Sequence, residues 1–337
     1  MRVEFLKHLC CPITRENLKI QYGDIVDDVI SNGMLTTESG EFSYPIVNGI
    51  PRFVSKSTYA DNFGMQWNQF RKTQLDSYSG HDISSERFWK STGWKPGDLK
   101  NKLVLDVGCG AGRFAEVALN AGAYLVALDY STAVEACFSN LKSHKRLIVI
   151  QGDVYNLPFP KEIFDYVYSL GVLQHTPDVH KAFSCLPPML KPGGYLCVDY
   201  YWKRFRTLMH AKYLFRPMTK RLPKEKLFRL LQIIVPIMLK TSQVLGSVPL
   251  IGVVLKRLIP VANYTGIFPL SGVQLREWAL LDTFDMLSPI HDNPQTEKII
   301  EKWFTLESNF SDVEVFHASH LVARGKKLQS IRDVEII

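Results

Sequence analysis

The sequence predicts an α/β fold in which a mostly parallel sheet carries helices on both faces. Short apolar runs alternate with amphipathic segments across residues 101–202, which is the pattern of buried parallel strands joined by helices. The first run, Leu103–Val107, is followed by three glycines at alternate positions and then by a helical segment at 113–120. A strand, a glycine turn and a helix form the first unit of a nucleotide-binding sheet.

The glycine spacing indicates which ligand this turn suits. A dinucleotide fingerprint has the spacing G-x-G-x-x-G. Here Gly112 comes one residue earlier, and Arg113 stands where that fingerprint has glycine. Asp106 lies two residues before Gly108. Because like charges repel, its carboxylate disfavours a pyrophosphate but suits a ligand with a cationic amino-acid end.

Further segments follow in the order that such a sheet requires. Residues 123–129 form an apolar run that ends in Asp129, 21 residues after Gly108. This is close to the ~20 residues expected before a carboxylate that holds ribose hydroxyls. Residues 147–153 end in Gly-Asp, residues 164–175 form a fourth strand with its active-site end, and residues 190–198 turn into a fifth strand.

The sequence D-V-G-C-G-A-G at 106–112 resembles motif I of the class I S-adenosylmethionine-dependent methyltransferases, and the other segments lie in register with it. The resemblance implies a Rossmann-like sheet of seven strands, the last antiparallel, and S-adenosyl-L-methionine as the cofactor. It implies that the glycine loop wraps the methionine part, that one carboxylate meets the ribose, and that an acid and the next backbone amide meet the adenine. The cofactor-binding residues expected on this basis are Asp106, Gly108, Cys109, Gly110, Gly112, Asp129, Tyr130, Asp153, Val154 and Leu170.

His175 is the candidate catalytic residue. It follows the fourth strand, where substrate and cofactor meet, and histidine as a residue type exchanges protons near neutral pH. A base is needed only where the attacking group must lose a proton, as an alcohol or phenol does; the alternative is that this histidine holds its loop. Asp285, His291 and Asp292 are second candidates that could return to the mouth of the site, and the alternative for them is a solvated loop.

Residues 1–55 are predicted to form a small β-rich domain of their own. The phrases L-x-C-P and Y-P-I-x-x-G-I-P resemble the zinc-ribbon-like domain of the tRNA-methyltransferase-activator family. A zinc ribbon needs four Cys or His ligands. Here Thr14 stands in place of the second ligand, and no cysteine lies between positions 36 and 44. We therefore expect a metal-free descendant of the ribbon; the alternative is a cramped site built from His8, Cys10 and Cys11.

The remainder, 56–337, is expected to be one methyltransferase domain. Residues 56–100 are expected to form helices that cover the cofactor, or that pack on the sheet through Trp67, Phe70 and Trp89. Residues 101–202 are the cofactor-binding core. Residues 289–327 are expected to supply a helix at 296–304 and strands at 312–316 and 320–324, before a loose tail after Lys326.

Residues 203–288 are predicted to form a helical cap. The stretch 203–257 carries a net charge of +12 and the rest of the chain −5. Four residues are expected to weaken any continuous helix here: Pro236, Gly246, Pro249 and Gly252. Only 15 uncharged residues separate Lys240 from Lys256, fewer than the ~20 of a membrane span, so we expect no transmembrane helix. The cap is expected to cover the substrate site, to lie on an anionic bilayer surface, or both.

The sequence thus predicts a cytoplasmic methyltransferase, because residues 1–14 lack the features of a signal peptide and six scattered cysteines fit a reducing compartment. The acceptor is expected to be a small or lipid-linked molecule, such as a sugar or quinone-like hydroxyl, near a membrane surface. One alternative is an RNA methyltransferase, which the basic segment favours and its aliphatic character disfavours. The other is a cofactor-binding subunit that stabilises a partner without catalysis.

Overall fold

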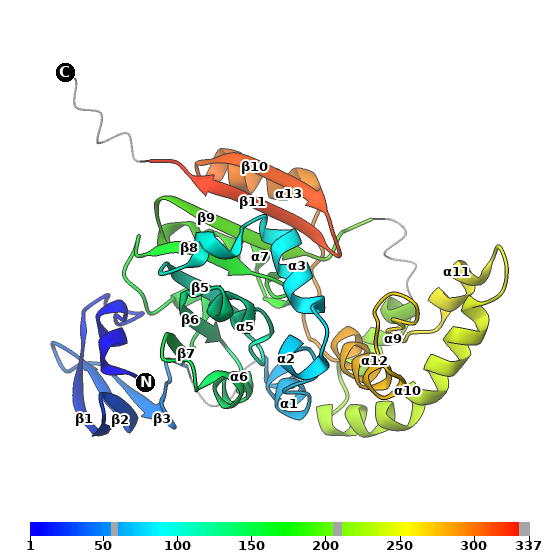
Figure 1. Cartoon of the computed structure of the whole chain (residues 1–337), viewed down its shortest axis with the longest axis horizontal. Coiled ribbons are helices and arrows are strands. Elements are labelled where there is room, and N and C mark those ends of the chain that lie inside the picture. The colour runs from blue at the N-terminus through cyan, green and yellow to red at the C-terminus, as the bar shows by residue number, and fades with distance from the viewer. Residues whose placement is uncertain (55–59, 205–210, 330–337) are drawn as a thin grey trace.

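A seven-stranded sheet is the centre of the molecule (Figure 1). The computed structural model describes residues 1–54, 60–204 and 211–329. The strand order is β10-β11-β9-β8-β5-β6-β7, in which β11 is antiparallel to both neighbours and the other neighbouring pairs are parallel. The strands are β5 (Leu103–Val107), β6 (Tyr124–Asp129), β7 (Leu147–Gln151), β8 (Phe164–Ser169), β9 (Leu190–Tyr200), β10 (Phe310–His317) and β11 (Leu321–Lys327). The predicted fold class, with its antiparallel last strand, is confirmed.

Helices cover both faces of this sheet because alternate strand residues point to opposite sides. Within β5, Val104 joins the core under α3 (Ile83–Thr92), α5 (Arg113–Asn120) and α6 (Ala133–Leu141). Its neighbour Leu105 joins the opposite core, under α7 (Val179–Ser184) and α13 (Glu297–Lys302). The helix α13 continues as a π-turn, Trp303–Glu307. The predicted tail lies outside the described residues from position 330 onward, and β11 itself extends to Lys327.

The segment before the sheet contains the predicted helices. They are α1 (Asp61–Gln69), α2 (Asp76–Ser79), α3 and α4 (Pro96–Leu99). Phe88 of α3 is fully buried and packs edge-on against Tyr168 of β8, with ring centroids 5.1 Å apart. The helix α3 therefore covers the same face of the sheet as α5 and α6.

The N-terminal residues form a separate antiparallel sheet on the edge of the central one. Its strands are β1 (Leu18–Val26), β2 (Val29–Thr37), β3 (Ser43–Val47) and β4 (Ile50–Pro51), preceded by the 3-10 turn η1 (Val3–His8). Arg52 forms a single parallel bridge with Gln151 of β7, and the Phe53 amide donates to the Gln151 carbonyl at 2.8 Å. Phe5 and Leu35 belong to the same apolar core as the strands of the central sheet. This N-terminal sheet is thus packed onto the edge strand β7.

The Cys11 thiol of this sheet is engaged by protein groups. Its Sγ lies 3.1 Å from Tyr44 Oη and accepts from the Thr14 amide at 3.4 Å. Among the described residues, no group of three or more His, Cys, Asp and Glu side chains is placed to hold a metal ion. We expect elemental analysis to find no stoichiometric zinc in the purified protein, and a chelator to leave its melting temperature unchanged. One zinc per chain whose removal lowers the melting temperature would contradict this.

The helices α9 (Ala211–Thr219), α10 (Lys224–Gly246), α11 (Gly252–Leu255) and α12 (Gly272–Leu287) form the cap at the right of Figure 1. The helix α10 runs through Pro236, so the expectation is wrong at this proline, whereas the helix does end at Gly246. The physical reason is tertiary packing, which offsets the hydrogen bond that proline cannot donate. A stripe of residues four apart is buried against α12: Leu227, Leu231, Val235 and Leu239.

By length and composition alone, α10 could cross a membrane, and it is the one such helix in the part of the chain that the structure describes. The stretch counted in the sequence, 241–255, overlaps this helix only at its end, because α10 spans Lys224–Gly246. Its buried stripe packs on α12, and only 33% of its most apolar window is buried. We therefore describe α10 as a cap helix with one face inside and one outside.

Candidate active site

The glycine loop lies at the carboxyl end of β5. Gly108 and Gly110 have φ angles of +86° and +52°, in the left-handed region that favours glycine. A Cβ at Gly108 would lie 2.4 Å from the Val172 side chain, and one at Gly110 would lie 3.1 Å from the Trp67 indole. The loop after β8 and the helix α1 therefore close on the turn from two sides. Trp67 was expected either to cover the cofactor or to pack on the sheet, and the structure places its indole beside Gly110 of the glycine loop.

Two other loop residues support this turn from within the protein. The Gly112 amide donates to the Cys109 carbonyl at 2.8 Å, and the Cys109 amide donates to the Leu128 carbonyl at 3.0 Å. The Cys109 thiol is buried, and its pKa is raised by its contact with the Cys137 thiol and by burial. Its side chain is therefore part of the core, so any contact of Cys109 with a ligand would be made by its backbone.

Asp106, the last-but-one residue of β5, carries a buried carboxylate that lies beside the Tyr168 hydroxyl. The residue is 2% exposed, and its Oδ2 has no hydrogen-bond partner among the described residues. Burial raises the pKa of Asp106 to about 8. A cationic group beside it would satisfy this oxygen and favour the ionised form. The α-amino group of S-adenosylmethionine is such a cation, so Asp106 fits the predicted cofactor.

Asp129, at the end of β6, anchors the glycine loop. Its Oδ2 accepts from the Gly110 amide at 2.9 Å, and its Oδ1 accepts from the Ser131 amide and hydroxyl at 2.8 and 2.7 Å. Burial raises the pKa of this carboxyl, and the hydrogen bonds oppose that rise. A carboxylate offers about four acceptor positions, so one remains for a ribose hydroxyl.

The remaining predicted cofactor residues follow the neighbouring strands. Asp153 comes after β7, where its Oδ1 accepts from the Tyr155 amide at 3.0 Å, and burial raises its pKa. Val154 and Leu170 are buried, and Tyr130 is half-buried directly after β6. Since β8, β5, β6 and β7 are adjacent in the sheet, their carboxyl ends bring the whole predicted set to one edge, and its contacts with the cofactor remain predictions.

We expect Asp129→Ala to weaken S-adenosylmethionine binding about 10- to 100-fold, because a hydrogen bond to a charged group contributes roughly 1.5–3 kcal/mol. The loss combines the ribose contact with the anchor of Gly110. Titration calorimetry with S-adenosylmethionine and S-adenosylhomocysteine measures it. Ser131→Ala is the matched control, because it removes one donor and leaves the carboxylate; it should change affinity at most a few-fold. Binding of NAD in place of S-adenosylmethionine would overturn the cofactor assignment.

His175 lies in the 3-10 turn Leu173–His175 after β8, with its ring in the interior. The residue is 7% exposed, and its ring packs between Phe63 and Tyr201, with centroid separations of 5.1 and 5.4 Å. Nδ1 lies 3.1 Å from the His291 carbonyl oxygen. Because a carbonyl only accepts, Nδ1 carries the proton in this contact. In the neutral ring Nε2 then holds a lone pair, and Nε2 has no hydrogen-bond partner among the described residues.

The segment 291–293 does return to His175. Besides the His291 carbonyl, the Asn293 amide donates to the Gln174 carbonyl at 2.9 Å and its side chain donates to the Thr176 carbonyl at 3.0 Å. The second candidates, Asp285, His291 and Asp292, therefore make different contacts. The backbone of His291 orients the catalytic candidate, and Asp285 accepts from the Tyr201 hydroxyl at 3.1 Å.

For Asp292, the alternative prediction of a solvated loop is wrong, because its side chain is buried. Its side chain is 3% exposed and lies 3.0 Å from Lys212 Nζ and 3.6 Å from Arg216 Nε, both of α9. A buried carboxylate is retained only where charges and donors compensate its desolvation. Asp292 therefore ties the cap to the segment beside His175.

Two buried glutamines mark further unsatisfied polar groups. Gln66 of α1 and Gln174, next to His175, are both 0% exposed, and neither amide oxygen nor nitrogen has a partner within the described residues. Native interiors leave few such groups unpaired. Together with Asp106 Oδ2 and His175 Nε2, these atoms indicate a site built for a polar ligand.

Sequence reasoning missed a charged network beside this site. Asp199 of β9 is 0% exposed; its carboxylate accepts from the Gly171 amide and, at 2.8 Å, from Arg87 Nη2. Burial alone would raise the pKa of Asp199, but Arg87 and His320 hold it well below its usual range. The only signal was one acid inside an apolar strand, because Arg87 lies 112 residues away in the chain.

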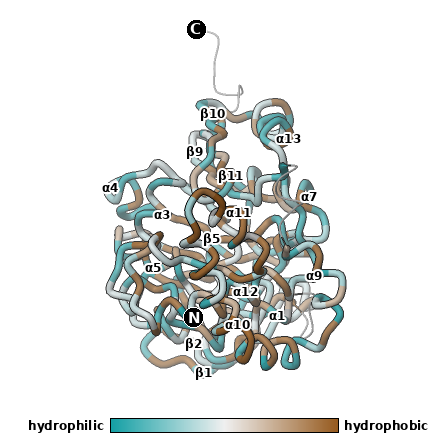
Figure 2. Tube along the Cα trace, turned by 90° about the vertical axis from the view of Figure 1, so that its right-hand side faces the viewer, coloured by the Kyte–Doolittle hydropathy of each residue, from teal (hydrophilic) through white to brown (hydrophobic). Residues whose placement is uncertain are grey.

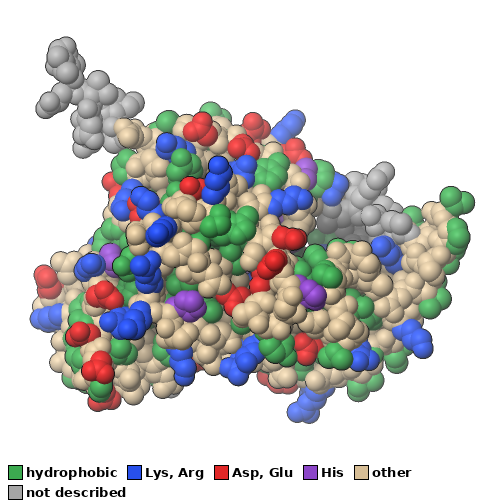
Figure 3. Space-filling view, viewed as in Figure 1, with side chains coloured by type: hydrophobic (Ala, Val, Ile, Leu, Met, Phe, Trp, Pro, Cys, Tyr) green, Lys and Arg blue, Asp and Glu red, His purple; other side chains and the backbone are tan. Residues whose placement is uncertain are grey.

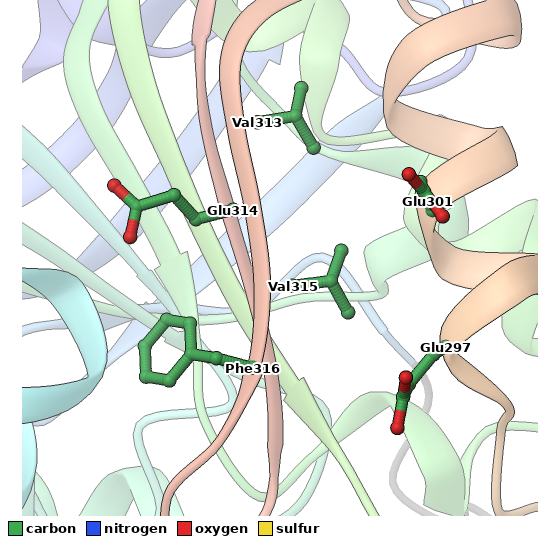
Figure 4. Close-up of a pocket in the computed structure, with 6 residues that line it drawn as sticks. All are labelled: Glu297, Glu301, Val313, Glu314, Val315 and Phe316. Atoms are coloured by element: carbon green, nitrogen blue, oxygen red, sulfur yellow. The ribbon is translucent and has the colours of Figure 1, made fainter.

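Neither of two open surface grooves contains a predicted cofactor residue. The groove in Figure 4, about 430 Å³, lies between α13 and β10 and is lined by Glu297, Glu301 and Glu314. Glu297 pairs with His317, and Glu314 pairs with Arg324 at 2.7 Å. The second groove, about 390 Å³, is lined by residues that include 177–180 and Trp303. The first groove thus presents three carboxylates and none of the residues predicted to bind the cofactor.

Comparison with known proteins places one family on the central part of the chain. The model of the methyltransferase domain family matches residues 105–198. The chain is 36% identical over 111 residues to sterol 24-C-methyltransferase of Pneumocystis carinii, and this alignment covers 32% of this chain and 29% of that protein. It is 29% identical over 128 residues to ubiquinone biosynthesis O-methyltransferase of Coxiella burnetii, covering 36% and 55%. The chain thus spans 29% and 55% of the length of these two curated relatives.

Among solved structures, a SAM-dependent methyltransferase from Methanosarcina mazei is 15% identical with a TM-score of 0.40, covering 68% of this chain and 94% of that chain. Magnesium protoporphyrin IX methyltransferase from Synechocystis is 14% identical with a TM-score of 0.42, covering 80% and 96%. These values describe remote likeness.

Proposed function

We propose that this protein transfers the methyl group of S-adenosylmethionine to a hydroxyl of a small or lipid-linked acceptor at a membrane surface, because residues 105–198 match the model of the methyltransferase domain family. The observation that carries the proposal is the buried Nε2 of His175, whose lone pair has no hydrogen-bond partner among the described residues. An imidazole held in this tautomer is suited to accept the proton of an alcohol or phenol.

Three side chains of the site, Asp106, Asp129 and His175, have different roles in this proposal. S-adenosylmethionine supplies, when bound, a methyl group on a positively charged sulfur. We assign its amino group to Asp106 and its ribose to Asp129, at the edge where β5 and β6 end. His175 would accept on Nε2 the proton that the acceptor hydroxyl gives up during the transfer. The His291 carbonyl orients the ring for this step and stabilises the imidazolium that results.

The surroundings of His175 favour an acceptor with an apolar body. Phe63 and Tyr201 flank the ring, and the cap helix α12 approaches through the contact of Tyr201 with Asp285. Aromatic walls with a few directed polar groups are typical of small-molecule sites. The exposed apolar side chains of the cap are mainly aliphatic, which suits acyl chains better than stacked bases.

The experiment is methyl transfer from radiolabelled S-adenosylmethionine to three separate extracts: total lipid, water-soluble metabolites and total RNA. We expect label in lipid or metabolites, in a product that resists the conditions that cleave methyl esters. Label confined to RNA would establish the RNA methyltransferase instead. Cofactor binding without label in any extract would favour the non-catalytic subunit.

A further inference from the structure

We infer that the outer face of α10 and the hairpin tip formed with α11 together insert into the acyl region of an anionic bilayer. We call this surface the apolar rim: Leu230, Ile233, Ile237 and Val244 on α10, and Val248, Leu250, Ile251, Val254 and Leu258 beyond it. All nine are exposed, by 38% to 102%. The inference deepens the proposed function and rests on it for the chemistry of the acceptor.

The apolar rim is a second face of α10, separate from the one that packs inside. The side chains that bury against α12 recur every four residues from Leu227 to Leu239. Leu230, Ile233 and Ile237 are offset from them by about half a turn at 100° per residue, and they are 47%, 69% and 65% exposed. A surface helix of a soluble domain normally carries polar residues on this side. Figure 2, which faces α10 and α11, shows hydrophobic stretches on both.

The hairpin tip is closed tightly and presents its apolar side chains outward. A Cβ at Gly252 would lie 2.5 Å from the Gly246 carbonyl oxygen, so the two helices meet backbone to backbone. Leu250 is 102% exposed and has a φ of +66°. A leucine in the left-handed region is strained, and a fully exposed leucine gains nothing from the protein interior. Burial of this side chain in lipid would offset the strain that solution leaves uncompensated.

The charges beside the apolar rim match an anionic surface. Residues 241–255 contain no charged side chain, and Lys240 and Lys256 stand at the two ends of this stretch. Lys226, Arg229 and Lys240 are exposed on α10. Figure 3 shows hydrophobic side chains at the far end of the hairpin and basic ones along the cap. Apolar side chains flanked by basic ones are the pattern of helices that lie in the interface of an anionic membrane.

Part of the basic charge of this segment is used inside the protein. Lys212 and Arg216 are buried beside Asp292, and Lys224 Nζ donates to the Ser288 carbonyl at 2.7 Å. Charge alone therefore attracts the cap to lipid less than the net count suggests, and the apolar rim has to supply the remainder of the affinity.

The test is flotation of the full chain with vesicles of phosphatidylcholine, with and without phosphatidylglycerol. The tip variant is Leu250→Ser/Ile251→Ser/Val254→Ser. Its matched control is Ile13→Ser/Val26→Ser/Leu306→Ser, which removes three aliphatic side chains that are 64%, 70% and 77% exposed elsewhere. We expect the tip variant to lose at least about tenfold in vesicle affinity and the control to bind like the wild type. Equal binding by both variants overturns the inference, as does a wild type that binds no vesicles.

A single variant separates insertion from a structural role of the tip. Leu250→Gly should leave the melting temperature unchanged or raise it, because glycine accepts the positive φ, and should weaken vesicle binding several-fold. A lower melting temperature with unchanged vesicle binding would overturn the inference. Light scattering after gel filtration tests whether a second copy of the chain, instead of lipid, binds the apolar rim. If the wild type is a dimer and the tip variant is a monomer, a second copy covers the rim and the inference is overturned. Because cofactor binding and transfer to a soluble acceptor are measured without lipid, failure of the proposed function is distinguishable from failure of insertion.

Discussion

Replacing His175 with alanine is expected to lower the turnover number about 10²- to 10⁴-fold, the usual contribution of a general base. The affinity for S-adenosylmethionine should stay within a few-fold of the wild-type value, because Asp106, Asp129 and the glycine loop are untouched. Steady-state kinetics with the acceptor found in the extracts, together with calorimetry for the cofactor, measures both quantities.

His175→Asn is the control that separates a base from a loop anchor. The asparagine amide can donate to the His291 carbonyl as Nδ1 does, but it has no group in the position of Nε2. If His175 is the base, the asparagine variant is as inactive as the alanine variant while its melting temperature is closer to that of the wild type. If the asparagine variant recovers activity, His175 is a loop anchor and the base must be another group.

Replacing Arg87 with methionine is expected to destabilise the fold by about 3–5 kcal/mol, the usual cost of leaving one partner of a buried ion pair uncompensated. The Asp199 side chain is 0% exposed and the Arg87 side chain 17% exposed. Chemical denaturation at neutral pH measures the loss. The double variant Arg87→Met/Asp199→Asn is the control, since it removes both charges and should recover much of the stability. If Arg87→Met alone unfolds like the wild type, the pair does not compensate a buried charge.

The pH dependence of this variant should have the opposite sign to that of the wild type. In the wild type, burial and Arg87 lower the pKa of His320, so the unfolded chain binds the proton more readily and stability rises with pH through the unfolded histidine pKa near 6.5. The lowered pKa of Asp199 adds stability above its unfolded value, which is lost as the solution becomes more acidic. Without Arg87, protonated His320 remains as a cation beside Asp199, with Nδ1 at 3.5 Å from Asp199 Oδ2. Its folded pKa should then exceed the unfolded value, and stability in this range should fall as pH rises.

Short-range patterns accounted for the strands and the loop. The run Leu103–Val107 is a strand with the predicted limits, and β6 begins one residue inside the predicted segment. Both are local hydrophobic runs bounded by polar or glycine residues, so burial and backbone preference agree over a few neighbouring positions. The α10 helix was mistaken for interrupted segments because packing on α12 overrides the local effect of Pro236.

The order of strands and helices, the glycine spacing and the acids at the strand ends can be predicted from the sequence alone, because each depends on consecutive residues. Three sets of contacts depend on the folded chain: Asp292 with Lys212 and Arg216, His175 with the His291 carbonyl, and Asp199 with Arg87 and His320. These contacts join residues up to 121 positions apart, so which charges are buried as pairs depends on how the chain folds back on itself. The same is true of α10, whose two apolar faces become one interior and one exterior surface only when α12 covers the first.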